Sequence, residues 1–124
     1  MSLFIKNRLK SFQFAFSGCL YVLHTQPNAW IHLFFTSAVI VMGLWLKISK
    51  WDWAVIIFAM ALVWISELFN TALEAVIDLV SKDQNHLARI GKDVGAAAVL
   101  IAAISSVIIG LLILGPPLWK QISP

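Results

Sequence analysis

Four polar residues in the segment 67–78 have the types and the spacing to form one chemical site. They are Glu67, Asn70, Glu74 and Asp78, and the residues between them are almost all apolar. On an α-helix with about 3.6 residues per turn, these side chains lie within roughly 80° of one another. Each carboxylate in lipid costs about 2.5–3.5 kcal/mol on insertion scales, so such a row requires cations, water or polar partners. The row therefore indicates a functional site, since hydrogen bonding between helices does not require several carboxylates.

The composition indicates that this row lies in or beside a membrane. The chain has 124 residues, of which 60% are hydrophobic and 12% are charged, whereas soluble domains have about 25% charged residues. A chain this short cannot cover so much apolar surface in one core. We therefore expect a single integral membrane domain over residues 1–124. The net charge of +3 comes from residues at the ends of apolar runs, which argues against nucleic-acid binding.

Three segments are apolar and long enough to cross a bilayer, which takes about 20 residues. We expect spans at about 29–48, 51–80 and 94–119, with tryptophans near their edges, because indole rings prefer the headgroup level. The middle segment is longer than the hydrocarbon, so Glu74 is expected near the inner membrane surface and Glu67 at the depth of lipid hydroxyl groups. Such a row can bring a water-soluble phosphate donor to a lipid acceptor.

The distribution of lysine and arginine predicts the orientation. Six of them precede the first span or join the second to the third, and three lie on the opposite side. The six are Lys6, Arg8, Lys10, Lys82, Arg89 and Lys92, and the three are Lys47, Lys50 and Lys120. Because cytoplasmic loops are enriched in Lys and Arg, we expect a multi-pass protein of the bacterial inner membrane. Its N-terminus and its 81–93 loop should be cytoplasmic.

The N-terminal segment at about 3–24 is predicted to be a helix on the membrane surface, and neither a span nor a cleavable signal peptide. Its apolar residues recur every three or four positions beside a polar stripe, which is typical of an interfacial amphipathic helix. The apolar set is Leu9, Phe12, Phe16, Leu20 and Leu23, and the polar set is Lys6, Lys10, Gln13 and Ser17. Pro27 favours the first turn of the next helix.

The loop after the middle span contains residues suited to a nucleotide. Lys92 can hold phosphate oxygens as a point charge, and Asp93 beside it can orient that lysine or hold an adenine or ribose group. The sequence has no GxxxxGK[ST] phosphate loop and none of the protein-kinase motifs. A nucleotide would therefore be held by these side chains and not by a glycine-rich loop.

Two motifs give the chain a resemblance to a known family. Glu67-x-x-Asn70-Thr-Ala-x-Glu74-Ala-Val-x-Asp78 is followed by Ala88-Arg-Ile-Gly-Lys92-Asp93-Val-Gly-Ala-Ala-Ala-Val. In residue type, spacing and position between spans, this pattern resembles the bacterial diacylglycerol kinase and undecaprenol kinase family. The segments 8–18 and 28–32 resemble the family too, so that the resemblance covers residues from about 6 to 115.

The resemblance implies an all-α integral membrane homotrimer whose active sites are shared between subunits. It implies MgATP as the donor and in-line transfer to the primary hydroxyl of a membrane lipid. The acceptor is diacylglycerol, giving phosphatidic acid in phospholipid biosynthesis, or undecaprenol, giving undecaprenyl phosphate. The sequence leaves this choice open.

The resemblance also assigns roles to site residues. Glu67 is the base that takes the proton of the lipid hydroxyl, and Asn70 orients the site. Glu74 binds the magnesium ion that bridges the ATP phosphates, while Lys92 and Asp93 hold the nucleotide. These roles agree with phosphoryl transfer in general, which depends on positioning and on charge neutralisation.

Gln26 departs from the family pattern. The family often has a second magnesium carboxylate at this position, before the first span. An amide oxygen can ligate magnesium but brings no charge. We therefore expect weaker metal binding, or compensation by Asp78 or another group, or altered activity.

Two other interpretations stay open at this point. A small proton-coupled transporter would use Glu67 or Glu74 as the carrier site and would give Lys92 and Asp93 no role. A catalytically silent membrane scaffold is the second, and the loss of a carboxylate at Gln26 favours it slightly.

Overall fold

The computed structural model of the chain is all-helical, and it describes residues 3–81 and 85–123. Its helices are α1 (Leu3–Thr25), α2 (Pro27–Leu46), α3 (Lys50–Val80) and α4 (His86–Ile122). Three of them, α2, α3 and α4, are long and apolar enough to cross a membrane by length and composition. The predicted fold of one N-terminal helix and three apolar helices is therefore confirmed. Lys82, Asp83 and Gln84, which the sequence assigns to the cytoplasmic loop, lie outside the described residues.

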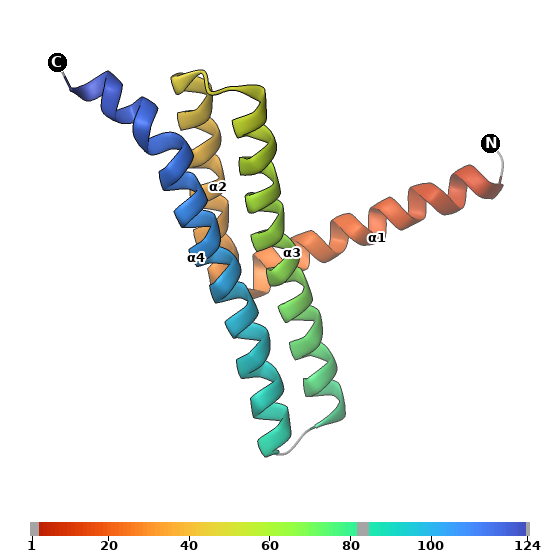
Figure 1. The fold of residues 1–124 in the computed structure, drawn as a ribbon. Coiled ribbons are helices and arrows are strands. Elements are labelled where there is room, and N and C mark those ends of the chain that lie inside the picture. The colour runs from red at the N-terminus through yellow and green to blue at the C-terminus, as the bar shows by residue number, and fades with distance from the viewer. Residues whose placement is uncertain (1–2, 82–84, 124) are drawn as a thin grey trace.

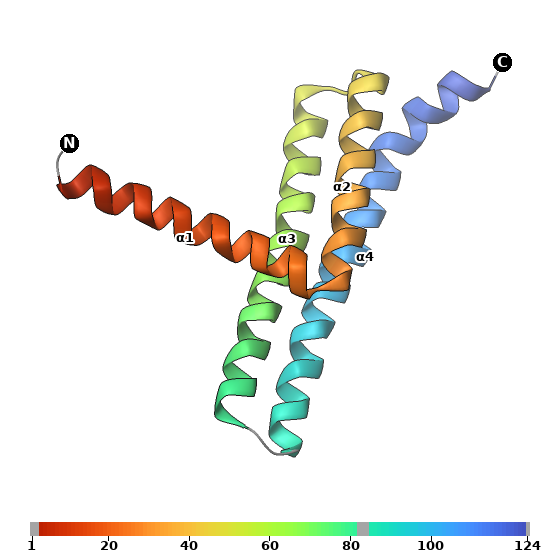
Figure 2. The same cartoon turned by 180° about the vertical axis from the view of Figure 1, so that it is seen from behind.

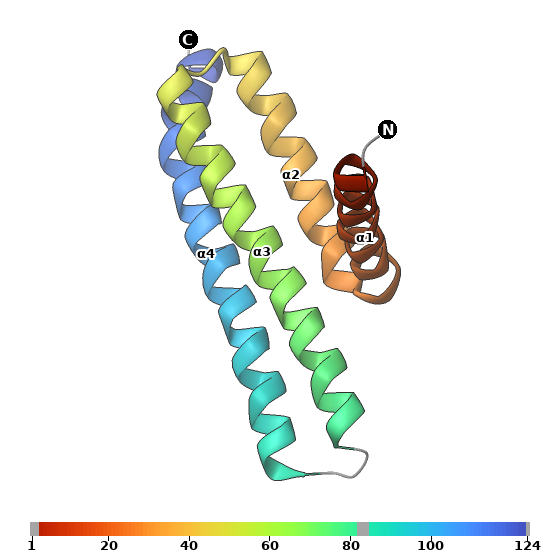
Figure 3. The same cartoon turned by 90° about the vertical axis from the view of Figure 1, so that its right-hand side faces the viewer.

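The three long helices run antiparallel to their neighbours in the chain (Figure 1). α3 and α4 share the largest interface, and α2 lies beside only part of their length, so that both extend past the start of α2 (Figure 3). The buried apolar residues of this interface include Ile56, Ala59 and Val63 on α3, and Val99 and Ala102 on α4. With 31 and 37 residues, α3 and α4 exceed the roughly 20 residues that hydrocarbon requires.

A tight turn fixes the α2–α3 hairpin. Lys47 ends α2 in the left-handed conformation, with φ at 52°, as is common at a helix C-terminus. Ser49 and Asp52 then form a reciprocal capping box that starts α3. A β-carbon at Gly43 would lie 2.9 Å from the Trp53 ring, so glycine allows this ring to pack against α2.

Small residues recur at every fourth position of α4, at Ala98, Ala102, Ser106 and Gly110, a spacing that favours close packing of helices in lipid. This row packs against α3 over part of its length. Ala102 is buried, and the hydroxyl of Ser106 donates to the carbonyl oxygen of Ala59 at 2.9 Å. The contact does not continue to Gly110, where an added β-carbon would meet nothing within 4 Å. The helices therefore leave open space beside Gly110.

α1 leaves the bundle at the start of α2 and projects to one side (Figure 2). Gln26 between them is extended, with φ −109° and ψ 111°, and Pro27 is the first residue of α2, as a residue before proline prefers. Val22 and Ala29 are buried at this bend between α1 and α2, called the elbow below, whereas Phe12 and Phe16 are exposed. The helix itself is confirmed, and its location on the membrane surface stays a prediction.

Candidate active site

The predicted acidic row follows one edge of α3 and runs from a buried end to an exposed end. Glu67 is 1% exposed and Asn70 is 9% exposed. Glu74 is half-buried and Asp78 is exposed. A charged group can be buried only with partners, so the contacts of these four side chains define what the site can do.

His32 of α2 is the partner of Glu67. Its Nε2 atom lies 3.7 Å from Oε2 of Glu67, and both side chains are largely buried. Neither atom has a hydrogen-bond partner. The His32 ring meets Trp64 edge-on with ring centroids 6.3 Å apart, and Trp64 Nε1 donates to Thr36 Oγ1 at 3.1 Å. Trp64 is thus a packing residue within the bundle, as its distance from the ends of the span suggests.

The sequence did not single out His32 as a site residue. None of the three histidines is spaced as a metal ligand, so spacing alone indicates ordinary residues at the membrane interface or in a loop. The signal that could have found it is its type, since a lone histidine within an apolar span needs a polar partner. Only the packing of α2 on α3 identifies that partner as Glu67.

Gln26 and Asn70 hold the Glu74 carboxylate from two sides. Gln26 Nε2 donates to Glu74 Oε2 at 3.2 Å, and Asn70 Nδ2 donates to Glu74 Oε1 at 3.1 Å. Gln26 reaches Glu74 because the elbow between α1 and α2 lies beside α3. The structure thus brings together three of the predicted site residues.

Gly95 lies directly against Asn70. A β-carbon at position 95 would collide with Asn70 Oδ1 and would lie 3.3 Å from a methyl group of Leu73. Asn70 Oδ1 is buried and has no hydrogen-bond partner. Glycine at this position therefore lets α4 approach α3 and sets the space available to the Asn70 amide.

Lys92 joins the exposed end of the row. Its Nζ atom forms an ion pair with Asp78 Oδ1 at 2.5 Å, and Glu74 also lies within electrostatic reach of this ammonium group. Asp93 turns to another partner, Arg89, whose Nε atom is 3.8 Å from Asp93 Oδ2. Within the described residues, the structure thus connects Lys92 to the row through Asp78 and pairs Asp93 with Arg89.

The side chains around Glu74 fit magnesium that arrives with a nucleotide. In the described parts of the chain, no group of three or more His, Cys, Asp or Glu side chains could hold a metal ion alone. The Gln26 carbonyl oxygen and the Glu74 carboxylate are hard oxygen donors on adjacent side chains. Magnesium is usually bound by one or two carboxylates, substrate phosphates and water, so this donor set suits the ion. Asp78, which the sequence offered as compensation for Gln26, is paired with Lys92 instead.

Comparison with known proteins places this helical bundle in a family. The family described as prokaryotic diacylglycerol kinase matches residues 13–114. The chain belongs to the prokaryotic diacylglycerol kinase family. This confirms the resemblance stated from the acidic row and the Lys92-Asp93 motif.

Two individual relatives carry names that agree with this family assignment. The chain is 46% identical over 113 residues to a diacylglycerol kinase of Synechocystis, and the match covers 90% of this chain and 65% of that protein. The chain thus spans slightly less than two thirds of this relative. It is 36% identical over 109 residues to an undecaprenol kinase of Bacillus subtilis, covering 88% of this chain and 89% of the relative. The lipid kinase function expected from the sequence agrees with both names, and the transporter and scaffold interpretations are not favoured.

Proposed function

We propose that the chain is a lipid kinase that transfers a phosphoryl group from ATP to the primary hydroxyl of a membrane lipid, either diacylglycerol or undecaprenol. The observation that carries this proposal is the continuous row from buried Glu67 to the exposed Asp78–Lys92 pair, in a chain of this family. One end of the row suits a lipid hydroxyl, and the other suits a nucleotide from the cytosol.

The proposed membrane placement follows the charge distribution. α1 lies on the cytoplasmic surface of the bacterial inner membrane, and α2, α3 and α4 cross it. The N-terminus and the α3–α4 connection are then cytoplasmic. This leaves Glu67 inside the membrane and Lys92 near its inner surface. Three copies of the chain assemble into a homotrimer whose active sites are shared between subunits, as the family resemblance implies.

Each site residue has a role that suits its surroundings. Glu67, at the buried end, accepts the proton of the lipid hydroxyl. Asn70 holds the Glu74 carboxylate in place, and Glu74 and Gln26 hold the magnesium ion that accompanies ATP. When bound, this ion neutralises charge on the transferring phosphate. Lys92 and Asp93 hold the nucleotide, and Asp78 orients Lys92.

A direct assay tests the proposal. The chain purified in detergent micelles is incubated with labelled ATP, magnesium and either diacylglycerol or undecaprenol, in parallel. We expect label in one of the two lipids, and we expect Glu67→Gln to lower kcat by at least about 100-fold, the contribution typical of general base catalysis. Glu67→Gln with wild-type kcat would remove Glu67 as the base.

The transporter hypothesis makes a different prediction. It requires uptake of a substrate into vesicles that depends on an ion gradient and not on ATP. Such uptake, together with no labelled lipid from either acceptor, would contradict the proposed kinase function. Running both acceptors side by side also decides between diacylglycerol and undecaprenol.

A further inference from the structure

Nε2 of His32 and Oε2 of Glu67 are two buried polar atoms that face each other without a hydrogen-bond partner. They lie 3.7 Å apart, which is longer than the roughly 2.7–3.2 Å of an N–H···O hydrogen bond. Buried polar atoms normally have partners, so the space between these two atoms suits a third group that contacts both. Sequence spacing does not reveal the pair, because its members belong to α2 and α3.

The two atoms are of the types that bind zinc. Zn–N and Zn–O distances are about 2.0–2.2 Å, so that two ligand atoms of a tetrahedral site lie about 3.4 Å apart. The pair is at 3.7 Å, so a zinc ion fits between the two side chains after a shift of about 0.3 Å. Magnesium prefers an octahedral set of oxygen atoms, and the imidazole therefore selects against the ion that accompanies ATP.

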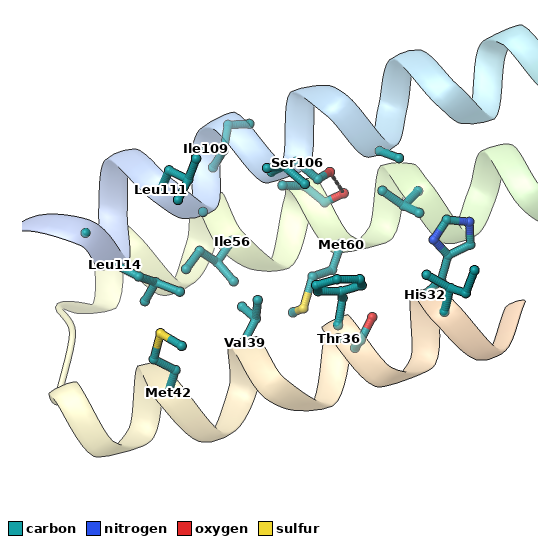
Figure 4. Close-up of a pocket in the computed structure, with 18 of the residues that line it drawn as sticks. His32, Thr36, Val39, Met42, Ile56, Met60, Ser106, Ile109, Leu111 and Leu114 are labelled. Atoms are coloured by element: carbon teal, nitrogen blue, oxygen red, sulfur yellow. Dashed lines mark hydrogen bonds between the residues drawn. The ribbon is translucent and has the colours of Figure 1, made fainter. Parts of the chain in front are cut away.

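Packing holds the imidazole in place and leaves open space on one side of it. The His32 ring meets Trp64 edge-on, and Trp64 donates to Thr36. Figure 4 shows His32 at one end of a groove of about 420 Å³ between α2, α3 and α4. No other imidazole and no carboxylate is among the residues that line this groove. The space beside His32 has room for water molecules, which complete the coordination of zinc when the protein supplies fewer than four ligands.

The charges around the pair favour a divalent cation. Glu67 is 1% exposed, and Glu74 lies within electrostatic reach of it on the same edge of α3. These two carboxylates offset the two positive charges of zinc, and a buried ion needs such compensation. In the proposed orientation, the row from exposed Asp78 inward gives a cation from the cytosol a path along carboxylates to the pair.

We propose that His32 and Glu67 form a zinc site, and that zinc bound there inhibits phosphoryl transfer. Zinc on Oε2 of Glu67 occupies the lone pair with which this carboxylate would accept the proton of the lipid hydroxyl. The inhibitory part of this inference rests on the proposed kinase function, whereas zinc binding itself does not depend on catalysis. Zinc should compete with the lipid acceptor and not with MgATP, because the proposed magnesium ligands Glu74 and Gln26 lie outside the pair.

Calorimetry tests binding without catalysis. The chain, purified in detergent micelles without a polyhistidine tag and without nucleotide, is titrated with zinc chloride. We expect His32→Gln to bind zinc at least about tenfold more weakly than the wild type, since even loss of an outer-shell partner costs this much. His24→Ala is the matched control, because it removes an exposed imidazole on α1, and its zinc affinity should equal that of the wild type. Equal affinities of the wild type and His32→Gln would overturn the proposal.

Cobalt gives a second measurement, on the wild type alone, that does not depend on the folding of a variant. Cobalt replaces zinc in many sites, and its visible absorption is intense when four ligands surround it tetrahedrally. We expect such absorption when cobalt chloride is added to the protein without nucleotide, and we expect zinc to abolish it. Absence of tetrahedral absorption in the wild type would overturn the proposed site.

Kinase assays test the inhibitory part, with free zinc set by a metal buffer because ATP also binds zinc. Activity with zinc is divided by activity without zinc within each variant, since His32→Gln alters the basal rate. Zinc should raise KM for the lipid acceptor and leave KM for ATP unchanged. The half-inhibitory zinc concentration should rise at least about tenfold in His32→Gln and stay unchanged in His24→Ala.

The outcomes separate the two proposals. Equal inhibition of the wild type and His32→Gln, or inhibition that MgATP relieves, would assign the effect to the nucleotide site and overturn the inhibitory role. Zinc binding that leaves the kinase rate unchanged would overturn this role as well. Zinc binding at His32 in a chain that phosphorylates neither lipid would overturn only the kinase proposal.

Discussion

Nε2 of His32 lies 3.7 Å from Oε2 of Glu67, and neither atom has a hydrogen-bond partner. The two residues come from different helices, and only the packing of α2 against α3 brings them together. An imidazole beside a buried carboxylate restricts the orientations of that carboxylate, and a base must lie within hydrogen-bond reach of the proton that it removes. We therefore expect His32 to position Glu67, the proposed base.

Removing the imidazole should slow the reaction and leave nucleotide binding intact. We expect His32→Ala to lower kcat between about tenfold and 100-fold, because a small displacement of a reacting group can cost this much, with KM for ATP unchanged. His32→Gln, which keeps a polar group of similar reach, should recover most of the activity. Steady-state kinetics with labelled ATP measures both effects.

His24 is the control for this prediction, since it is exposed and belongs to α1. His24→Ala should have wild-type kinetics. If His32→Ala also keeps the wild-type kcat, His32 has no role in orienting Glu67.

Gly95→Ala should displace the Asn70 amide. The added β-carbon collides with Asn70 Oδ1, and the Asn70 side chain also donates to Glu74. We expect the free energy of unfolding to fall by about 1–3 kcal/mol, as is usual when an extra group is forced into a packed core. We also expect the magnesium concentration for half-maximal activity to rise. Thermal unfolding and a magnesium titration are the measurements.

Gly18→Ala is the matched variant for Gly95→Ala, because a β-carbon at Gly18 meets nothing within 4 Å. It should be neutral or slightly stabilising, since alanine favours helix over glycine. Equal stability and equal magnesium dependence of the two variants would show that the Gly95–Asn70 contact is unimportant.

Asp78→Asn should release Lys92. The ammonium group of Lys92 would lose its carboxylate partner at 2.5 Å, and its long flexible stem would then sample more positions. We expect KM for ATP to rise about threefold to tenfold, with little change in kcat. Stability should change little, because an exposed ion pair contributes little.

Lys50→Gln is the control for Asp78→Asn, since it removes an exposed charge at the start of α3, away from the acidic row. It should leave KM for ATP unchanged. An unchanged or lower KM in Asp78→Asn would mean that Asp78 competes with the nucleotide for Lys92 and does not orient it.

Gln26→Glu should strengthen magnesium binding. The new carboxylate would lie beside Glu74, where Gln26 Nε2 now donates at 3.2 Å, and two carboxylates attract a divalent cation more strongly than one. We expect the magnesium concentration for half-maximal activity to fall several-fold. Without magnesium the free energy of unfolding of the variant should be lower, because the carboxylates at positions 26 and 74 would repel each other.

Gln13→Glu adds the same charge on exposed α1 and should leave the magnesium dependence unchanged. An unchanged magnesium requirement in Gln26→Glu would mean that position 26 is not part of the metal site.

The helices and the acidic row could be predicted because both depend on local sequence. A run of about 20 apolar residues needs lipid whatever its neighbours are, and the spacing of Glu67, Asn70 and Glu74 places them on one edge of any helix. The pairing of Gln26 with Glu74 was also within reach, since the family resemblance assigns both positions to magnesium.

The partners of these residues could not be predicted because they depend on how helices pack. His32 meets Glu67, and Gly95 meets Asn70, across interfaces whose register the sequence does not state. The open space beside Gly110 is another case, since the regular spacing of small residues on α4 favours packing but does not state where the neighbouring helix ends its contact. The amphipathic placement of α1, the orientation in the membrane and the trimer stay predictions.

α1 joins the bundle through the extended residue Gln26. With 23 residues, this helix is about 34 Å long, and only its C-terminal end lies beside the bundle (Figure 2). Gln26, at the junction of α1 and α2, donates a hydrogen bond to the carboxylate of Glu74. In the proposed membrane placement, a tilt of α1 would move Gln26 and with it the oxygen atoms around Glu74, so that the bilayer surface and the proposed metal site would be coupled.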